Sequence, residues 1–358
     1  MEKEKFWRIP AGVRDWLPGE RASRRQLEEI MTRTFALWGY REVATPTLEY
    51  WDSISLGLND EGREVIKLID RNGDILVLRP DWTTPIARLT ASRLAQWPLP
   101  LRLFYSGQVF TQVEPQVGRW REYGQAGVEL IGLPGGWADG EVVALAAESL
   151  LAAGLKEFQL HLGHMGLLQG LMAEQGLTPE QEREVKAAVS RKDLVRAEQL
   201  LGRGAELLTL RGGREMLVRA EQLTRGPEAA QALAELGETM DYLEAYGLAE
   251  RIVLDFSLLR GLDYYTGVIF EGFAPGLGFS LCGGGRYDGL LARFGQPLPA
   301  TGFAIGYERL LLALERQGVN RQGMDTEVRL QRREKNWTEV LAEARRRRAA
   351  GEIVIVEG

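Results

Sequence analysis

The chain has 358 residues, 45% of them hydrophobic and 26% charged, and a net charge of −6, which is typical of a soluble globular protein and argues against a general nucleic-acid binder. No apolar run approaches the roughly 18 residues of a membrane span, and the N-terminal MEKEKFWRIP lacks the apolar core of a secretory signal. The single cysteine, Cys282, excludes an internal disulfide, so we expect a cytoplasmic protein.

Glycine stops and apolar periodicity divide the first 150 residues into elements. Residues 24–40 repeat apolar side chains at helical spacing and end near Gly39, a residue type that commonly stops helices. The next segment, 41–50, predicts a strand with a proline kink. Residues 70–80 predict a β-hairpin, because Asn-Gly is the strongest short turn signal. Further elements are expected as strands at 100–110 and 125–132 and as a helix at 140–151.

The composition changes between about 165 and 245, where Ala, Glu, Leu, Gln and Arg replace strand-forming residues. We interpret this region as a helical insertion between two strand-rich halves of one sheet. Later elements are expected as strands at 251–259, 267–274 and 278–289 and as a helix at 306–317. This order predicts an α+β fold with a mainly antiparallel sheet flanked by helices. We expect a core over 1–316 and a short C-terminal segment over 317–358 that ends with the strand-like GEIVIVEG.

Several common chemistries have no sequence support. The chain contains neither a G-x-x-x-x-G-K-[ST] phosphate loop nor a G-x-S-x-G nucleophile elbow. His161 and His164 lie three residues apart without a third ligand nearby, so we expect structural histidines and no metal site.

Charged residues interrupt four strand-like segments, 78–88, 118–132, 258–272 and 280–290. A charge inside a strand is costly unless it is paired, so these residues belong either to a structural ion-pair network or to a ligand pocket. The neighbouring glycines and aromatics favour a ligand pocket. The charged residues concerned are Asp81, Arg119, Arg121, Glu129, Arg260, Asp263, Arg286 and Asp288.

Two of these segments, LLRGLDYYTGVIFE at 258–271 and GGGRYDGL at 283–290, resemble the histidine-recognition segments of histidyl-tRNA synthetases. Other landmarks of that family follow in order between residue 8 and about residue 316: GVRDWLPGE, GYREVATPTLE, LRPDWTTPIAR and GFAIGYERLLLAL. The resemblance implies a class II aminoacyl-tRNA synthetase-like core. It also implies a homodimer formed through the first class II motif, around Thr45 and Pro46.

The resemblance further implies a pocket for free L-histidine. Asp81 and Glu129 would accept hydrogen bonds from the ammonium group of histidine, with help from Thr83. Gln125 lies four strand residues before Glu129, so its side chain would lie on the same face of the strand and enter the same pocket. An arginine fork suits the carboxylate, and tyrosines suit the imidazole. The residues assigned to histidine are Asp81, Thr83, Arg119, Gln125, Glu129, Arg260, Tyr264 and Tyr265.

The second class II motif departs from the pattern of active synthetases. They read Phe-Arg-x-Glu-Arg-Pro-Gln, whereas residues 110–116 read FTQVEPQ, so Thr111, Val113 and Glu114 replace the groups that contact ATP. Losing one preorganised donor costs about 3–4 kcal/mol of transition-state stabilisation, so we expect no adenylation, no catalytic residues and no cofactor. The segment 317–358 is also shorter than the anticodon-binding domain of the synthetases, which makes tRNA an unexpected partner.

LRPDWTTPIAR instead resembles the synthetase paralogues that serve as regulatory subunits of ATP phosphoribosyltransferase. That resemblance implies a non-catalytic partner of the short-form catalytic subunit in the first step of histidine biosynthesis, which it activates and through which histidine exerts feedback inhibition.

Two alternatives stay open on the sequence. Arg119, Arg260 and Arg309 support a divergent enzyme that still activates histidine. The run 329–348, with eight Arg or Lys against three Glu, supports a stand-alone histidine sensor or RNA-binding regulator.

Overall fold

The computed structural model describes residues 6–58, 65–258, 265–319, 328–331 and 336–357. The chain divides into two compact units, one formed by residues 1–14 and 27–319 and the other by residues 15–26 and 320–358. None of the described helices is both long and apolar enough to cross a membrane.

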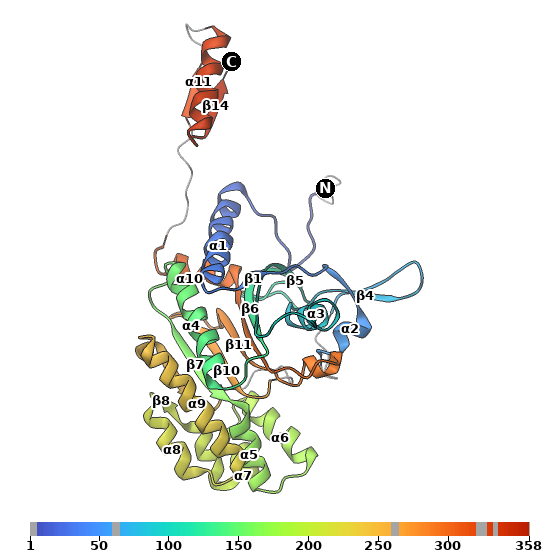
Figure 1. The fold of residues 1–358 in the computed structure, drawn as a ribbon, viewed down its shortest axis with the longest axis vertical. Helices are drawn as coiled ribbons and strands as arrows, with labels where there is room; N and C mark the ends of the chain where they lie inside the picture. The colour runs from blue at the N-terminus through green and yellow to red at the C-terminus, as the bar shows by residue number, and fades with distance from the viewer. Residues whose placement is uncertain (1–5, 59–64, 259–264, 320–327, 332–335, 358) are drawn as a thin grey trace. The chain divides into compact units, whose positions relative to one another are not determined.

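A nine-stranded sheet forms the centre of the first unit (Figure 1). Only the pairs β1–β5 and β7–β9 are parallel, which confirms the expected mainly antiparallel sheet. The strands in spatial order are β1 (Arg41–Glu42), β5 (Leu101–Phe110), β6 (Glu122–Ile131), β12 (Ala300–Gly306), β11 (Cys282–Arg286), β10 (Val268–Phe273), β7 (Gln159–His164), β9 (Ile252–Asp255) and β8 (Arg211–Gly212).

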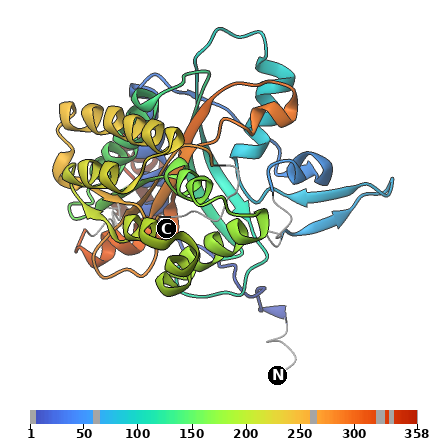
Figure 2. The same ribbon diagram turned by 90° about the horizontal axis from the view of Figure 1, so that it is seen from below.

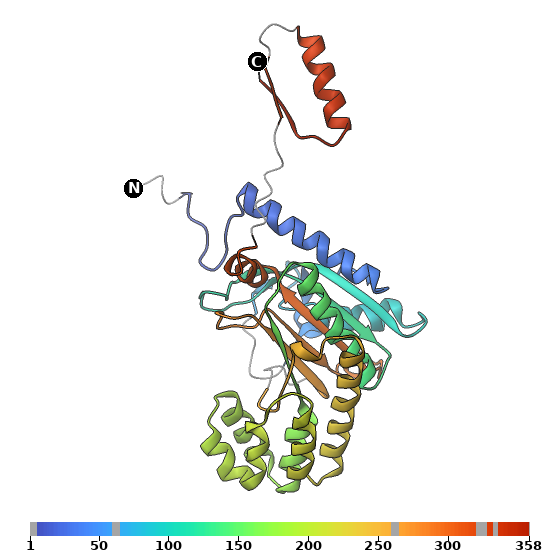
Figure 3. The ribbon, with the colours of Figure 1, turned by 90° about the vertical axis from the view of Figure 1, so that its left-hand side faces the viewer.

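Alternating side chains on the strands create a separate core on each face of this sheet. On β5, Phe104 packs into a core that contains α4 (Gly136–Ala152), whereas Leu103 and Tyr105 point to the other core. Figure 3 shows α4 beside α9 (Pro227–Ala245) on the first face. The helix α1 (Pro18–Leu37) begins before the predicted residue 24, and its part from Leu27 onward packs into the core of the first unit. The remaining helices near the sheet are α10 (Tyr307–Arg316) and the short η4 (Ala249–Arg251) and η5 (Leu291–Phe294).

The predicted helical insertion is confirmed, apart from the two-residue edge strand β8 within it. Local signals fix its helix starts: Thr178 and Gln181 form a capping box around Pro179, and Asp193 caps the following helix. Figure 2 shows these helices packed together at one end of the first unit. They are α5 (Met165–Glu174), α6 (Pro179–Ser190), α7 (Leu194–Leu201), the 3-10 helix η3 (Gly202–Thr209), α8 (Glu215–Leu223) and α9.

The predicted hairpin at 70–80 forms part of a three-stranded antiparallel sheet, β2 (Leu48–Tyr50), β4 (Ile75–Leu78) and β3 (Lys67–Ile69). Gly73 closes its turn at φ +87°, a conformation that favours glycine. The single strand expected at 41–50 divides instead into β1 and β2, on either side of Pro46. The helices beside this small sheet are α2 (Trp51–Ser55), α3 (Thr83–Leu89) and the π-helix η2 (Thr90–Leu94).

In the second unit, β13 (Val328–Gln331) and β14 (Val354–Glu357) pair in parallel and α11 (Trp337–Ala349) connects them. The strand-like end of the chain therefore completes a small sheet. Several arginines here have local partners: Arg347 contacts Glu343 and Glu352, and Arg348 donates to the carbonyl of Val354. Some arginines of the basic run, Arg329, Arg346 and Arg347, are thus paired with carboxylates of their own unit.

Candidate functional site

Two adjoining cavities lie against the strands β6, β11 and β12, where α3 begins. The smaller has a volume of about 80 Å³ and the larger about 620 Å³. Both are lined by Pro80, Tyr123, Gln125, Gly283 and Ala304, so they form two ends of one cleft. The two ends differ in the chemistry of their walls.

Glu129 is a buried carboxylate directly behind the wall of the small cavity, where it is hydrogen-bonded to the lining residues Thr83 and Tyr287. It lies on β6, 1% exposed, and its Oε1 accepts a 2.8 Å hydrogen bond from the Thr83 hydroxyl. The Tyr287 hydroxyl donates to its Oε2. Gly302 faces Glu129 across the β6–β12 ladder, and a Cβ at Gly302 would collide with the carboxylate. The glycine therefore provides the space that the buried carboxylate occupies.

Burial raises the pKa of Glu129 to about 8. The hydrogen bonds from Tyr287 and Thr83 lower this pKa, while the charge of Asp81 raises it further. A buried carboxyl with so high a pKa favours a cationic partner, because a nearby ammonium group would stabilise its ionised form.

Asp81 supplies a second buried carboxylate. It is 8% exposed, and its Oδ1 accepts a 2.9 Å hydrogen bond from the backbone N–H of Thr84 in the first turn of α3. Asp81 and Thr83 both line the small cavity. The structure therefore brings Asp81, Thr83 and Glu129 together as the sequence predicts.

Trp82 forms one wall of the small cavity. Its ring stacks on Tyr105 with 4.9 Å between centroids, and the Arg79 guanidinium lies 3.5 Å from its ring centroid. Gly107 lies beneath the indole, where a Cβ would come within 2.7 Å of the ring. Trp82 is therefore held rigidly at 3% exposure and faces the pocket rather than solvent.

Gln125 and the buried Tyr265 also line the small cavity. Arg119 lines only the larger one, so it lies with the opposite end of the cleft. Arg260 and Tyr264 fall outside the described residues.

The larger cavity is lined by the residues of the second class II motif that differ from the motif of active synthetases. Thr111, Val113 and Glu114 all line it. Arg309 also lines it, and its guanidinium donates to the carbonyls of Gly118 at 3.0 Å and Ser280 at 2.8 Å. These backbone contacts use donor groups that a phosphate would otherwise accept from.

Several known proteins resemble this chain in sequence and fold. A family model described as Histidyl-tRNA synthetase matches residues 12–310. A relative from Desulforamulus reducens, named ATP phosphoribosyltransferase regulatory subunit, is 47% identical over 334 residues, 90% of this chain and 83% of the relative. The chain belongs to the family of ATP phosphoribosyltransferase regulatory subunits.

Further comparisons agree with this family. A regulatory subunit from Moorella thermoacetica is 50% identical over 317 residues, 85% of this chain and 81% of the relative. A Bacillus halodurans crystal structure, described as an ATP phosphoribosyltransferase regulatory subunit/histidyl-tRNA synthetase, is 36% identical with a TM-score of 0.89, covering 98% of this chain and 92% of that one. Histidyl-tRNA synthetase from Nostoc sp. PCC 7120, at 20% identity and a TM-score of 0.84, covers 98% of this chain and 86% of its own and shares the fold.

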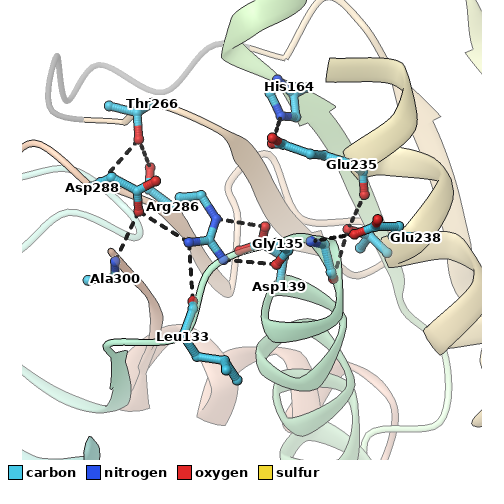
Figure 4. A network of polar contacts seen from close by, with 12 residues as sticks. Leu133, Gly135, Asp139, His164, Glu235, Glu238, Thr266, Arg286, Asp288 and Ala300 are labelled. Carbon is cyan, nitrogen blue, oxygen red and sulfur yellow. Dashed lines mark hydrogen bonds and ion pairs between the residues drawn. The ribbon is translucent and has the colours of Figure 1, made fainter. Parts of the chain in front are cut away.

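In this regulatory-subunit family member, Arg286 and Asp288 lie outside both cavities, contrary to the polar pocket expected from the sequence. The Arg286 side chain, 3% exposed, donates to Asp139 at 3.0 Å, to Asp288 at 3.1 Å and to the carbonyl of Gly135 at 3.0 Å. Figure 4 shows this network between the start of α4 and the end of β11. Arg286 is therefore a structural residue that fixes α4 to the sheet.

The two histidines have structural partners, as the sequence predicts. His161 lies 3.3 Å from Asp255. His164 lies 2.9 Å from Glu235 of α9 (Figure 4). Among the described residues, no group of three His, Cys, Asp or Glu side chains could hold a metal ion.

Sequence reasoning missed two residues of the small cavity. Tyr287 follows Arg286 in GGGRYDGL, and Gly302 begins GFAIGYERLLLAL, so both lie inside quoted segments. Their contact with Glu129 depends on the alignment of β6, β12 and β11, which the segments alone do not specify.

Proposed function

We propose that this protein is a non-catalytic regulatory subunit of a short-form ATP phosphoribosyltransferase. It activates the catalytic chain, and free histidine bound in the small cavity transmits feedback inhibition to that chain. Histidine can act in this way only if it binds two conformations of the complex with different affinities. We propose that the histidine site lies within the class II synthetase-like core, residues 1–316. We also propose that the protein acts in the cytoplasm.

The difference between the two ends of the cleft carries this proposal. At the small end the buried carboxylate of Asp81 lines the cavity, and that of Glu129 lies directly behind its wall, bonded to Thr83 and Tyr287; both suit an ammonium group. At the large end Thr111 and Val113 offer no charge to a triphosphate, and Glu114 would repel it. The cleft therefore keeps groups that can bind an amino acid but lacks groups that stabilise a triphosphate, which favours histidine sensing over adenylation.

We further propose that Arg260 binds the histidine carboxylate and that Tyr264 and Tyr265 contact the imidazole. Gln125 would bond to the polar end of the ligand, because it lines the small cavity with Asp81 and Thr83. Arg119, at the other end of the cleft, is less well placed than Asp81, Thr83, Gln125 and Tyr265, which line the small cavity.

An activity assay with a purified short-form catalytic chain tests the regulatory role. We expect the catalytic chain to gain activity on addition of this protein and to lose that gain as histidine is added. Absence of any rate change at every histidine concentration would contradict the proposal. Histidine-dependent exchange of pyrophosphate into ATP by this protein alone would support the alternative of a histidine-activating enzyme.

Histidine binding should strengthen as the pH rises from about 6 to about 8. Free Glu129, with its pKa of about 8, is protonated over this range and must lose its proton to face an ammonium group. The affinity should therefore rise by at most about tenfold per pH unit and level off above about pH 8. Calorimetry in buffers of different ionisation enthalpy measures the released proton.

The variant Glu129→Gln is the control for this pH series, because the histidine ligand itself also titrates between pH 6 and 8. In Glu129→Gln only the ligand's own titration should remain. An identical pH dependence in wild type and variant would mean that Glu129 does not titrate on binding. For folding the sign is opposite: the folded-state pKa lies above the ordinary value, so Glu129 contributes stability at low pH that is lost as the pH rises through about 8.

We also propose a homodimer through the first class II motif around Thr45 and Pro46. The small sheet that follows this motif exposes an apolar face: Tyr50 and Leu68 flank Leu76 in register and are 55% and 43% exposed. An exposed apolar sheet face of this kind is typical of an association surface.

Replacing both Tyr50 and Leu68 by aspartate should convert the dimer to monomer in analytical ultracentrifugation, because two carboxylates would be buried in the interface. Ile69→Asp is the matched control, since Ile69 is 82% exposed and, as the next residue of β3, points to the opposite face. Equal dissociation of both variants, or of neither, would place the dimer interface elsewhere.

A further inference from the structure

Four aromatic side chains form a continuous row at the surface of the first unit, and none of them lines either cavity of the cleft. Ring centroids are 5.4 Å apart between Trp38 and Tyr246, 6.4 Å between Tyr246 and Tyr242, and 5.1 Å between Tyr242 and Trp137. We call these four residues the aromatic row. Trp137 is 58% exposed and Tyr246 is 43% exposed.

The aromatic row combines three separate elements. Trp38 directly follows α1, and Trp137 is the second residue of α4. Tyr242 lies in the last turn of α9, and Tyr246 directly follows that helix. Trp137 and Tyr246 are exposed, and the half-buried Trp38 and Tyr242 join them to the core. Tyr and Trp are enriched in the energetically dominant parts of protein interfaces.

The support beneath the aromatic row is rigid. Gly140 of α4 allows the Tyr242 ring to lie directly against the helix, where a Cβ would come within 2.6 Å of that side chain. Nearby, Glu141 receives two 2.8 Å hydrogen bonds from Arg102 and one of 3.0 Å from the hydroxyl of Tyr40. A partner would therefore meet a surface that needs little ordering on binding.

The charge of the two helices that carry most of the aromatic row indicates what it binds. The sequences of α4 and α9 contain eight Asp or Glu residues and no Lys or Arg. Five of the eight already have an ion-pair partner within the described part of the chain: Asp139, which is buried, pairs with Arg286, Glu141 with Arg102, Glu235 with His164, and Asp241 and Glu244 share Arg214. Because Asp241 and Glu244 share one arginine and Glu148 forms no ion pair with the described residues, the surface around Tyr242 and Tyr246 keeps an excess of negative charge. Glu148 lies close enough to Tyr246 to raise its pKa, an effect second to partial burial.

We propose that the aromatic row is a docking surface for an arginine-bearing basic face of the catalytic partner chain. This proposal rests on the proposed function and adds the contact surface to it. Guanidinium groups stack on tyrosine and tryptophan faces and pair with neighbouring carboxylates, so aromatic rings inside an acidic surface suit arginine in particular. The surface is formed by residues separate from those of the histidine cavity.

The double variant Trp137→Ala/Tyr246→Ala tests this docking surface. We expect its affinity for the purified catalytic chain, measured by calorimetry, to fall at least tenfold, with histidine affinity unchanged. Trp97→Ala is the matched control, because Trp97 is 47% exposed and lies outside the row. Wild-type affinity for the catalytic chain should also fall as salt is raised, as expected for charge-assisted contact.

Each other outcome counts against the docking surface. If the double variant binds the catalytic chain as tightly as Trp97→Ala does, the row is not the contact, although the regulatory function stands. If the variant changes the self-association of this protein in ultracentrifugation, the row contacts a second copy instead. If wild-type protein binds no catalytic chain at all, both the docking surface and the proposed function are wrong.

Discussion

Glu129→Ala is expected to weaken histidine binding by about 2–5 kcal/mol, roughly thirtyfold to several thousandfold in Kd, because it removes a buried carboxylate that faces the proposed ammonium group. Glu129 is 1% exposed and held by Thr83 and Tyr287, so water cannot readily replace it. Isothermal titration calorimetry with L-histidine measures the change.

Two further variants separate the loss of charge from damage to the fold. Glu129→Gln keeps the side-chain size and should lose most of the affinity as well. Glu315→Ala removes an exposed carboxylate from α10 and should bind histidine as the wild type does. Unchanged affinity in both Glu129 variants, with normal folding by circular dichroism, would show that histidine binds elsewhere.

Arg286→Ala is expected to lower the free energy of unfolding by about 3–5 kcal/mol, because it leaves the buried Asp139 without its cation. The same change removes hydrogen bonds to Asp288 and to the carbonyl of Gly135. Urea denaturation followed by circular dichroism measures the loss.

Arg214→Ala provides the comparison for Arg286. Arg214 also contacts two carboxylates, Asp241 and Glu244, but its side chain is 45% exposed. Solvent screening should limit the loss there to less than about 1 kcal/mol. Similar losses for Arg286→Ala and Arg214→Ala would contradict a structural role for the buried network.

Much of the fold could be predicted because its signals are local. The hairpin depends on Gly73, whose positive φ closes the short loop between the flanking strands. The helical insertion depends on composition and on capping residues such as Thr178 and Asp193. The division of residues 41–50 into two strands was not predicted, since both parts have strand character and only their pairing partners differ.

The candidate site was predicted less completely, because its contacts join residues that are distant in the sequence. Asp81, Thr83 and Glu129 were identified as one group and do lie together. Arg286 carries the same sequence pattern, a charge in a glycine-rich strand, but its partner is Asp139 on α4. Sequence shows that a buried charge requires a partner, but it does not show which partner it has.

The sequence by itself determined the family resemblance, the order of the elements and the replacement of the nucleotide contacts by Thr111, Val113 and Glu114. Only the tertiary structure decided which charges face the cleft and which hold α4 to the sheet, and that Gly302 makes room for Glu129. The physical reason is that local patterns fix backbone conformation, whereas strand register and helix packing decide which distant side chains come within hydrogen-bonding distance.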